Sequence, residues 1–216
     1  MDKKPEKQPT ETDYLIDDIL GVAGETDLLE TDHMPAGRKH TRISARRRFE
    51  RVQQKESLLD IIPEPPGPGE SIHIIGTGEY DFWTFVPQMI DWIGYAAHLT
   101  CSTWTLNRQN AIEFLELWDA GKIGMADFLT GLYFKRRETA VYTMLLEGIR
   151  ARGGRYRAFR NHAKVLLLEN PDRDAWITVE GSANLTANPR LEQYVMTNDR
   201  ALYDFHRTWT EEALTT

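Results

Sequence analysis

The chain has 216 residues and a mass of 24.9 kDa, enough for one domain with a sizeable core and a further segment. Hydrophobic residues make up 41% and charged residues 27%, which excludes a wholly disordered chain, and the net charge of −7 argues against a surface that is basic throughout. The single cysteine, Cys101, excludes an intramolecular disulfide framework and a metal site built from cysteines. No stretch has the roughly 20 apolar residues of a membrane span, and residues 1–13 lack the apolar core of a secretory signal, so we expect a cytoplasmic chain.

Residues 1–68 are predicted to form a largely disordered arm that is first acidic and then basic. Residues 1–37 have a net charge of −7, whereas residues 38–55 have a net charge of +7. Residues 61–70 contain four prolines and two glycines, which is typical of an extended linker. Short amphipathic helices are expected around Tyr14–Val22 and Ile43–Asp60, each too short to be stable without a partner. Residues 1–60 are therefore a candidate region for binding a protein partner.

Residues 69–216 are predicted to form the folded domain. Strands are expected at 71–76, 98–106, 125–134, 155–160, 163–169, 175–182 and 193–198. Helices are expected at 82–97, 110–123, 136–154 and 201–214, with glycines at 121 and at 153–154 ending two of them. Strands that alternate with helices and then follow one another closely indicate an α/β fold with a mixed β-sheet flanked by helices.

Reactive side chains concentrate between residues 161 and 193. On a strand, alternation places His162 and Lys164 on one face, about 7 Å apart along the chain. An imidazole that can attack and a fixed positive charge can thus meet one phosphate. After the next strand come Gly181, Ser182, Ala183 and Asn184, a glycine turn that lets small polar side chains approach an anion. Asn184 can donate to a phosphoryl oxygen, Ser182 can position a neighbour, and Glu192 can hydrogen-bond His162 and fix its tautomer.

These residues resemble the HxK…GSxN signature of the phospholipase D superfamily, which includes phosphodiesterases and nucleases. The resemblance covers about two thirds of the chain and implies one phospholipase D-like half-domain. It further implies that one histidine forms a phosphohistidine, that a second histidine protonates the leaving oxygen, and that no metal or other cofactor is required. Carried over, His162 is the nucleophile or its acid partner, Lys164 and Asn184 bind phosphate, and Ser182 and Glu192 support them.

Two departures from the family pattern concern the connection between the motif strands. Glu169 stands where the family has Asp, so its supporting role is doubtful and it is left out of the site. Eleven residues, 170–180, replace the usual six before Gly181, and 170–174 are expected to form an enlarged hairpin turn away from the site. The sequence contains no second His-x-Lys, so a mechanism with two histidines predicts a homodimer with the active site on its two-fold axis.

We expect a phosphodiesterase that acts on nucleic acid, with DNA favoured as the substrate. Arg155, Arg157 and Arg160 precede the motif and can bind a polyphosphate chain, although a solvated basic stripe explains them equally well. The basic run at 38–55 can also tether DNA. The alternatives are a phospholipase or phosphatidyl transferase, and a catalytically inactive nucleic-acid-binding or assembly module. Trp104 can line the cleft or belong to the core, and Cys101 is expected to be buried and inert.

Overall fold

The computed structural model describes residues 42–44, 47–51, 58, 62–76, 81–186 and 190–215, with only the backbone described for 42–51. All of them belong to the second of the chain's two units, residues 38–216. The helix expected at Tyr14–Val22 lies outside the described residues, so it stays a prediction, as does the division of the chain at residue 68.

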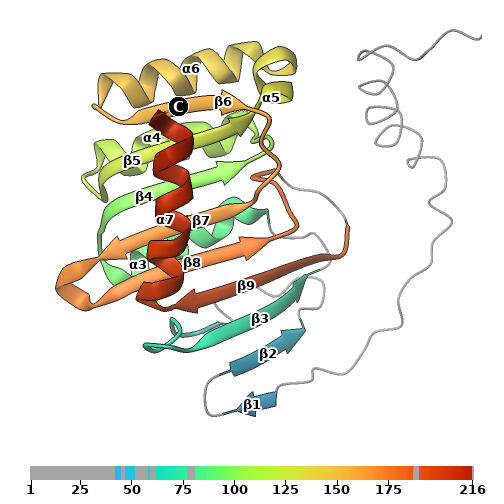
Figure 1. Ribbon diagram of the computed structural model, residues 1–216, viewed down its shortest axis with the longest axis vertical. Helices are drawn as coiled ribbons and strands as arrows, with labels where there is room; N and C mark the ends of the chain where they lie inside the picture. Colours follow the sequence, from blue (N-terminus) through green and yellow to red (C-terminus); the bar gives the residue numbers. More distant parts are fainter. Residues whose placement is uncertain are drawn as a thin grey trace, which may run out of the picture. The chain divides into compact units, whose positions relative to one another are not determined.

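The described residues form one mixed β-sheet of nine strands in the order β1-β2-β3-β9-β8-β7-β4-β5-β6 (Figure 1). β4, β5 and β6 are parallel to one another, as are β2 and β3, whereas all the other neighbouring strands are antiparallel. The expected α/β fold with a mixed sheet is therefore confirmed. The strands are β1 (Arg42–Ser44), β2 (Arg47–Arg51), β3 (Ser71–Gly76), β4 (Ala96–Thr103), β5 (Ile123–Gly131), β6 (Arg155–Phe159), β7 (Val165–Asn170), β8 (Ala175–Gly181) and β9 (Glu192–Asn198).

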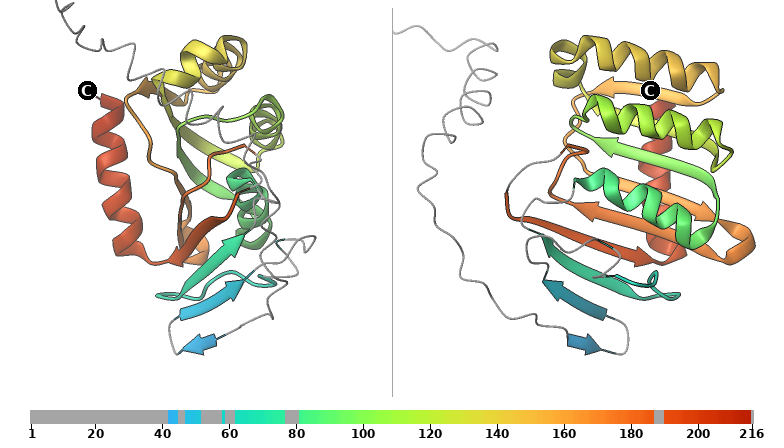
Figure 2. Two further views of the ribbon diagram at one scale, coloured as in Figure 1. Left: turned by 90° about the vertical axis from the view of Figure 1, so that its right-hand side faces the viewer. Right: turned by 180° about the vertical axis from the view of Figure 1, so that it is seen from behind.

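Helices cover both faces of the sheet (Figure 2). One face carries α3 (Phe85–Ile93), α4 (Arg108–Asp119) and α6 (Thr139–Ala151), and α7 (Arg200–Thr215) crosses the opposite face. The shorter helices are η2 (Phe82–Thr84), α5 (Leu132–Arg137) and η3 (Pro171–Arg173). No helix in the described part of the chain is both long and apolar enough to cross a membrane.

The central strand β7 explains why the core has two sides. Leu166 and Leu168 pack into the main core, whereas Val165 and Leu167 pack with Tyr203 of α7 on the other face. A strand that is buried on both faces needs a continuous apolar run, which this segment of the sequence supplies. Cys101 is buried as expected, and burial raises the pKa of its thiol.

Two expected helices differ from the structure. Within Ile43–Asp60, the described residues 43–44 end β1 and 47–51 form β2 rather than a helix, because the pairing of β2 with β3 overrides weak local preference. The single helix expected at 136–154 is two helices, α5 and α6, which meet at Glu138, where the backbone leaves the helical region (φ −109°, ψ 45°). α5 begins at Leu132, inside the segment that was expected to continue the preceding strand.

The ends of most strands lie along one side of the sheet, where loops connect the strands, and we call this side the site edge. It is the right-hand edge in Figure 1, where the arrows of β3, β4, β5, β6 and β8 end and β7 and β9 begin. The connections after β4, β5 and β6 therefore lie beside the start of β7. All the predicted catalytic residues lie at this edge or in the loops that leave it.

Candidate active site

His162 and Lys164 lie in the segment that joins β6 to β7. They precede β7, which starts at Val165, so the expectation that they belong to the strand is wrong. The segment is instead held by Asn161, whose amide donates to Ser102 Oγ at 2.9 Å and accepts from the Ala163 N–H at 3.0 Å. A side chain that hydrogen-bonds its own backbone two residues on replaces the strand's ladder locally.

The expectation that the histidine and the lysine share one side of the chain is confirmed. Lys164 Nζ lies 2.9 Å from Nδ1 and 3.3 Å from Nε2 of His162, and 2.8 Å from the His162 carbonyl oxygen. His162 is exposed, whereas Lys164 is only 7% exposed. Burial lowers the pKa of Lys164 to about 8, although the charge of Glu192 opposes this shift. A nucleophilic ring and a cation that is still charged at neutral pH thus occupy one small volume.

The hairpin of β7 and β8 brings the second half of the motif to the first. The Gly181 N–H donates to the Lys164 carbonyl at 3.2 Å. A Cβ at Gly181 would lie 2.8 Å from Tyr194 Cδ1 and 3.1 Å from the Gln193 carbonyl, so only glycine fits this position. The two half-motifs, separated in sequence, are therefore joined by a direct backbone contact.

Ser182 and Glu192 support the site from β8 and β9. The Ser182 hydroxyl donates to Glu192 Oε2 and accepts from the Gln193 N–H at 3.0 Å. Glu192 is 9% exposed, and its charge acts on Lys164. The predicted hydrogen bond between Glu192 and His162 stays a prediction, but the structure does place the carboxylate where it stabilises the lysine cation.

An open cavity of about 560 Å³ collects part of the predicted set. His162, Lys164 and Ser182 line it, whereas Asn184 and Glu192 do not. Asn184 is half-buried, and its side-chain oxygen is buried without a hydrogen-bond partner among the described residues. Unpaired buried polar atoms are rare in folded proteins, so this amide is a group that a bound ligand or water can complete.

The same cavity contains a histidine and a carboxylate, His206 and Glu180, that the sequence did not indicate as site residues. His206 and Trp209 of α7 and Glu180 of β8 line it together with His162. Trp209 Nε1 donates to His206 Nδ1 at 3.0 Å, which leaves the proton of a neutral ring on Nε2, 3.3 Å from Glu180 Oε1. This contact lowers the pKa of Glu180. No short motif links these residues, and only the packing of α7 on the sheet brings them to the site.

The predicted arginines have different surroundings. Arg155 forms ion pairs with Asp127 at 2.5 Å and Glu211 at 2.6 Å, and Arg157 donates to the Ala213 carbonyl. Both guanidinium groups therefore bind within the chain, on the face that α7 covers. Arg160 is exposed and lies two residues before His162.

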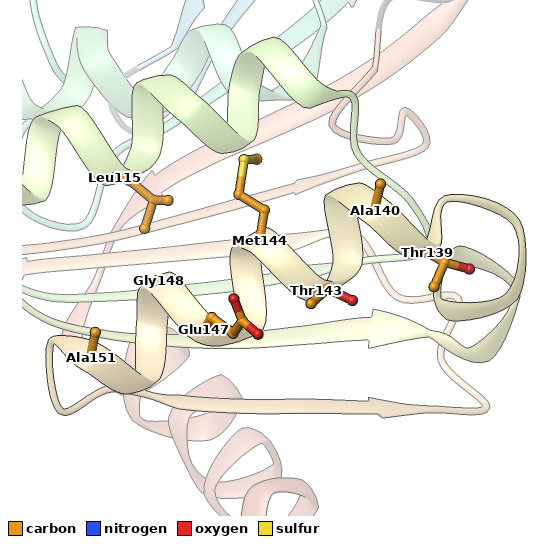
Figure 3. A pocket seen from close by; sticks show the side chains of 8 residues that line it. All are labelled: Leu115, Thr139, Ala140, Thr143, Met144, Glu147, Gly148 and Ala151. Carbon is orange, nitrogen blue, oxygen red and sulfur yellow. The ribbon is translucent and has the colours of Figure 1, made fainter.

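A second groove lies on the outer face of α6, away from this cavity (Figure 3). Leu115 of α4 and Met144 of α6 face each other there, and the absence of a side chain at Gly148 allows Leu115 to approach α6 closely. Glu147 is the one charged residue in its lining. Because the lining has neither a cation nor a histidine, it offers no phosphate site.

Comparisons with known proteins identify the fold. Neither the scan against protein-family models nor the search of curated proteins gives a match. Among solved structures, a phospholipase D family member, Nuc from Salmonella typhimurium, is 14% identical with a TM-score of 0.50, covering 66% of this chain and 93% of that one. The chain therefore has the fold of the phospholipase D superfamily, as its motif predicted.

Two further solved structures are similar over about the same share of the chain. Polyphosphate kinase from Porphyromonas gingivalis is 15% identical with a TM-score of 0.48, covering 65% of this chain and 25% of that one. Phosphatidylserine synthase from Haemophilus influenzae is 13% identical with a TM-score of 0.45, covering 67% and 38% respectively.

Proposed function

We propose that the chain is a metal-independent phosphodiesterase that cleaves nucleic acid, with DNA as the favoured substrate, through a phosphohistidine at His162. The observation that carries this proposal is the convergence of His162, Lys164 and Ser182 on one cavity at the site edge of a phospholipase D-type fold. A nucleophile, a cation and a small hydroxyl in one open cavity are the groups that attack at phosphorus requires.

The first step transfers the phosphoryl group to the enzyme. A ring nitrogen of His162 attacks phosphorus with its lone pair, the bond from phosphorus to the leaving oxygen breaks, and that oxygen takes a proton from a second histidine. Lys164 neutralises the nonbridging oxygens as the charge on them grows, and Asn184 donates to one of them. Glu192 faces Lys164 and keeps its ammonium charged against the cost of burial.

The second step hydrolyses the phosphohistidine. A water molecule loses a proton to the second histidine, now neutral, and attacks phosphorus, which breaks the bond from nitrogen to phosphorus and restores His162. Since the sequence has a single His-x-Lys, we propose that the second histidine is His162 of the partner subunit in a two-fold homodimer.

Cleavage assays in EDTA test the chemistry. Wild type, His162→Asn and His73→Asn, a matched control on β3 outside the cavity, are incubated with plasmid, single-stranded DNA, RNA and phosphatidylcholine vesicles. We expect EDTA-resistant cleavage of DNA that only His162→Asn loses, and an acid-labile phosphoenzyme in wild type. Cleavage that requires Mg²⁺ would overturn the mechanism. Hydrolysis of phosphatidylcholine and of none of the nucleic acids would show that the substrate is a phospholipid. Tight DNA binding without turnover would identify a binding module.

The shared active site is tested by the dependence of activity on concentration. Specific activity should fall as the enzyme is diluted through the dissociation range of the dimer, in step with the mass measured by light scattering. A strict monomer with full activity would overturn the shared site. In that case the second histidine has to come from the same chain, and His206, which lines the same cavity, is the residue to replace.

A further inference from the structure

A column of stacked side chains stands beside His162. The ring of Trp104 lies 5.6 Å from the ring of His162 at 51° and is stacked on Tyr133 at 4.4 Å and 15°. Trp104 follows β4, Tyr133 follows β5, and His162 follows β6. Because these three strands are parallel neighbours, their connections meet at the site edge. The sheet order thus builds the column next to the proposed nucleophile.

The column is fixed in place by the backbone beneath it. The Gly131 N–H donates to the Trp104 carbonyl at 3.2 Å, and a Cβ at Gly131 would lie 2.5 Å from Trp104 Cδ1. The indole can therefore lie where it does only above a glycine. A binding surface that already has its bound geometry loses little conformational freedom when a ligand arrives.

The outer end of the column is exposed and basic. Arg137 holds its guanidinium 5.5 Å from the centre of the Tyr133 ring and donates to the Tyr133 hydroxyl. Lys135, Arg136 and Arg137 are consecutive exposed residues that end α5. Glu138, 3.8 Å from Arg137, is the acidic neighbour and leaves the group with a net positive charge.

Core packing does not account for this arrangement. Phe114 and Phe128 of the core are fully buried, whereas Trp104 and Tyr133 are each half-buried and belong to neither hydrophobic cluster of the described residues. Flat rings that alternate with cations are the surface that binds single-stranded nucleic acid, in which bases stack on aromatic rings and phosphates meet the charges. A lipid headgroup has no ring to stack, and the bases of an intact duplex are already stacked on one another.

We propose that Tyr133 and Arg137, with Trp104 behind them, form a base-binding site for a single-stranded polynucleotide. The base next to the scissile phosphate stacks on the face of Tyr133 opposite Trp104, beside the Arg137 guanidinium that now donates to the Tyr133 hydroxyl. Arg137 turns to the adjacent phosphate, and Lys135 and Arg136 bind the phosphates beyond it. This inference rests on the proposed function, since it names the strand type that the His162 site cleaves and how the strand is aligned.

Kinetics with matched substrates test the stack. Tyr133→Leu should raise the KM for a single-stranded oligonucleotide about tenfold, the size of one lost base–aromatic stack, while Tyr133→Phe keeps the wild-type value. An abasic nucleotide beside the cleaved phosphate should weaken wild type by the same factor and leave Tyr133→Leu unchanged. Hydrolysis of bis(p-nitrophenyl) phosphate, which cannot reach along the column, should be the same in all three proteins.

A second variant tests the charge. Arg137→Gln should lower the slope of log affinity against log salt by about one phosphate contact, whereas Arg150→Gln, an exposed control at the opposite end of α6, leaves it unchanged. This measurement also decides the matter if Tyr133→Leu fails to fold.

Several results would overturn the base-binding site. One is that Tyr133→Leu raises KM equally for normal and abasic strands. Another is that it lowers the hydrolysis of bis(p-nitrophenyl) phosphate as much as that of the oligonucleotide. The third is that Arg137→Gln leaves the slope of log affinity against log salt unchanged. Failure of the proposed function looks different, because wild type then cleaves neither substrate. In that case fluorescence anisotropy of a labelled oligonucleotide still decides the question, since Tyr133→Leu must bind it about tenfold more weakly than Tyr133→Phe does.

Discussion

Replacing Asn161 by alanine should damage the site without touching any residue of the motif. The Asn161 side chain is 7% exposed and makes four hydrogen bonds. Its amide nitrogen donates to Ser102 Oγ at 2.9 Å and to the carbonyl oxygens of Thr103 and Leu129, each at 3.3 Å. Its oxygen accepts from the Ala163 N–H at 3.0 Å. The loop that carries His162 is thereby attached to β4 and β5.

The loss of stability in Asn161→Ala can be estimated from the hydrogen-bond partners that Asn161 leaves behind. The N–H of Ala163, an exposed residue, loses the acceptor that Asn161 supplies and binds water instead, so this bond accounts for about 0.5–1.5 kcal/mol. Ser102 Oγ still donates to the Ala163 carbonyl, and the two strand carbonyls lose long, weaker bonds. We therefore expect the free energy of unfolding to fall by about 1–3 kcal/mol. Because a misplacement of about 1 Å can cost about 100-fold in rate, kcat should fall as well.

Urea denaturation of Asn161→Ala, together with cleavage kinetics, checks both numbers. Gln109→Ala is the matched control, because Gln109 is exposed in the first turn of α4 and should change stability by less than about 0.5 kcal/mol. A loss below about 1 kcal/mol with unchanged kcat would refute the role assigned to Asn161, since that is the cost of an ordinary surface hydrogen bond.

Three further substitutions have expected outcomes. Lys164→Met should abolish cleavage yet raise the free energy of unfolding at pH 7, because burial lowers the pKa of Lys164 from 10.5 to about 8 in the folded protein. Between pH 8 and 10.5 the folded wild type binds fewer protons than the unfolded chain, so its stability rises with pH. Urea titrations should therefore show that the stability advantage of Lys164→Met shrinks over this pH range. Gly181→Ala should cost about 1–3 kcal/mol and most activity, whereas Gly67→Ala, whose Cβ meets only a side-chain oxygen at 3.6 Å, should melt like wild type. Arg155→Gln should lower the melting temperature strongly, because buried Asp127 then has less charge compensation. An unchanged melting temperature together with weaker DNA affinity would instead show that Arg155 binds the substrate.

The fold was predictable because its strands have distinct patterns. The continuous apolar run at 165–168 is the signature of a strand buried on both faces, and the two half-motifs that flank the hairpin of β7 and β8 indicated the superfamily. The helix expected around Ile43–Asp60 is wrong at residues 43–44 and 47–51, because helical spacing in the sequence does not show that β2 pairs with β3. Pairing at a sheet edge depends on a distant partner, which local periodicity cannot show.

The site was predictable only where its residues are close in sequence. His162, Lys164 and Ser182 flank one hairpin, so their convergence followed from two strands and a turn. His206 lies 44 positions after His162, and Tyr133 lies 29 before it, on helices whose packing no motif encodes. The surroundings of Arg155 and Arg157 were not predictable for the same reason, because alternation along β6 predicts a shared face but does not show that α7 covers that face.

The long connection between the half-motifs illustrates which lengths matter to the site. β7 and β8 stay paired from Val165↔Glu180 to Asn170↔Ala175, and the extra residues form η3 at the far end. The pairing next to the site, not the number of residues in the turn, fixes the distance from Lys164 to Gly181. Glu169 pairs with Trp176 near that turn, about 16 Å along the strand from Lys164. A carboxylate there cannot reach a phosphate bound at His162, so the replacement of the family's Asp by Glu169 leaves the proposed chemistry intact.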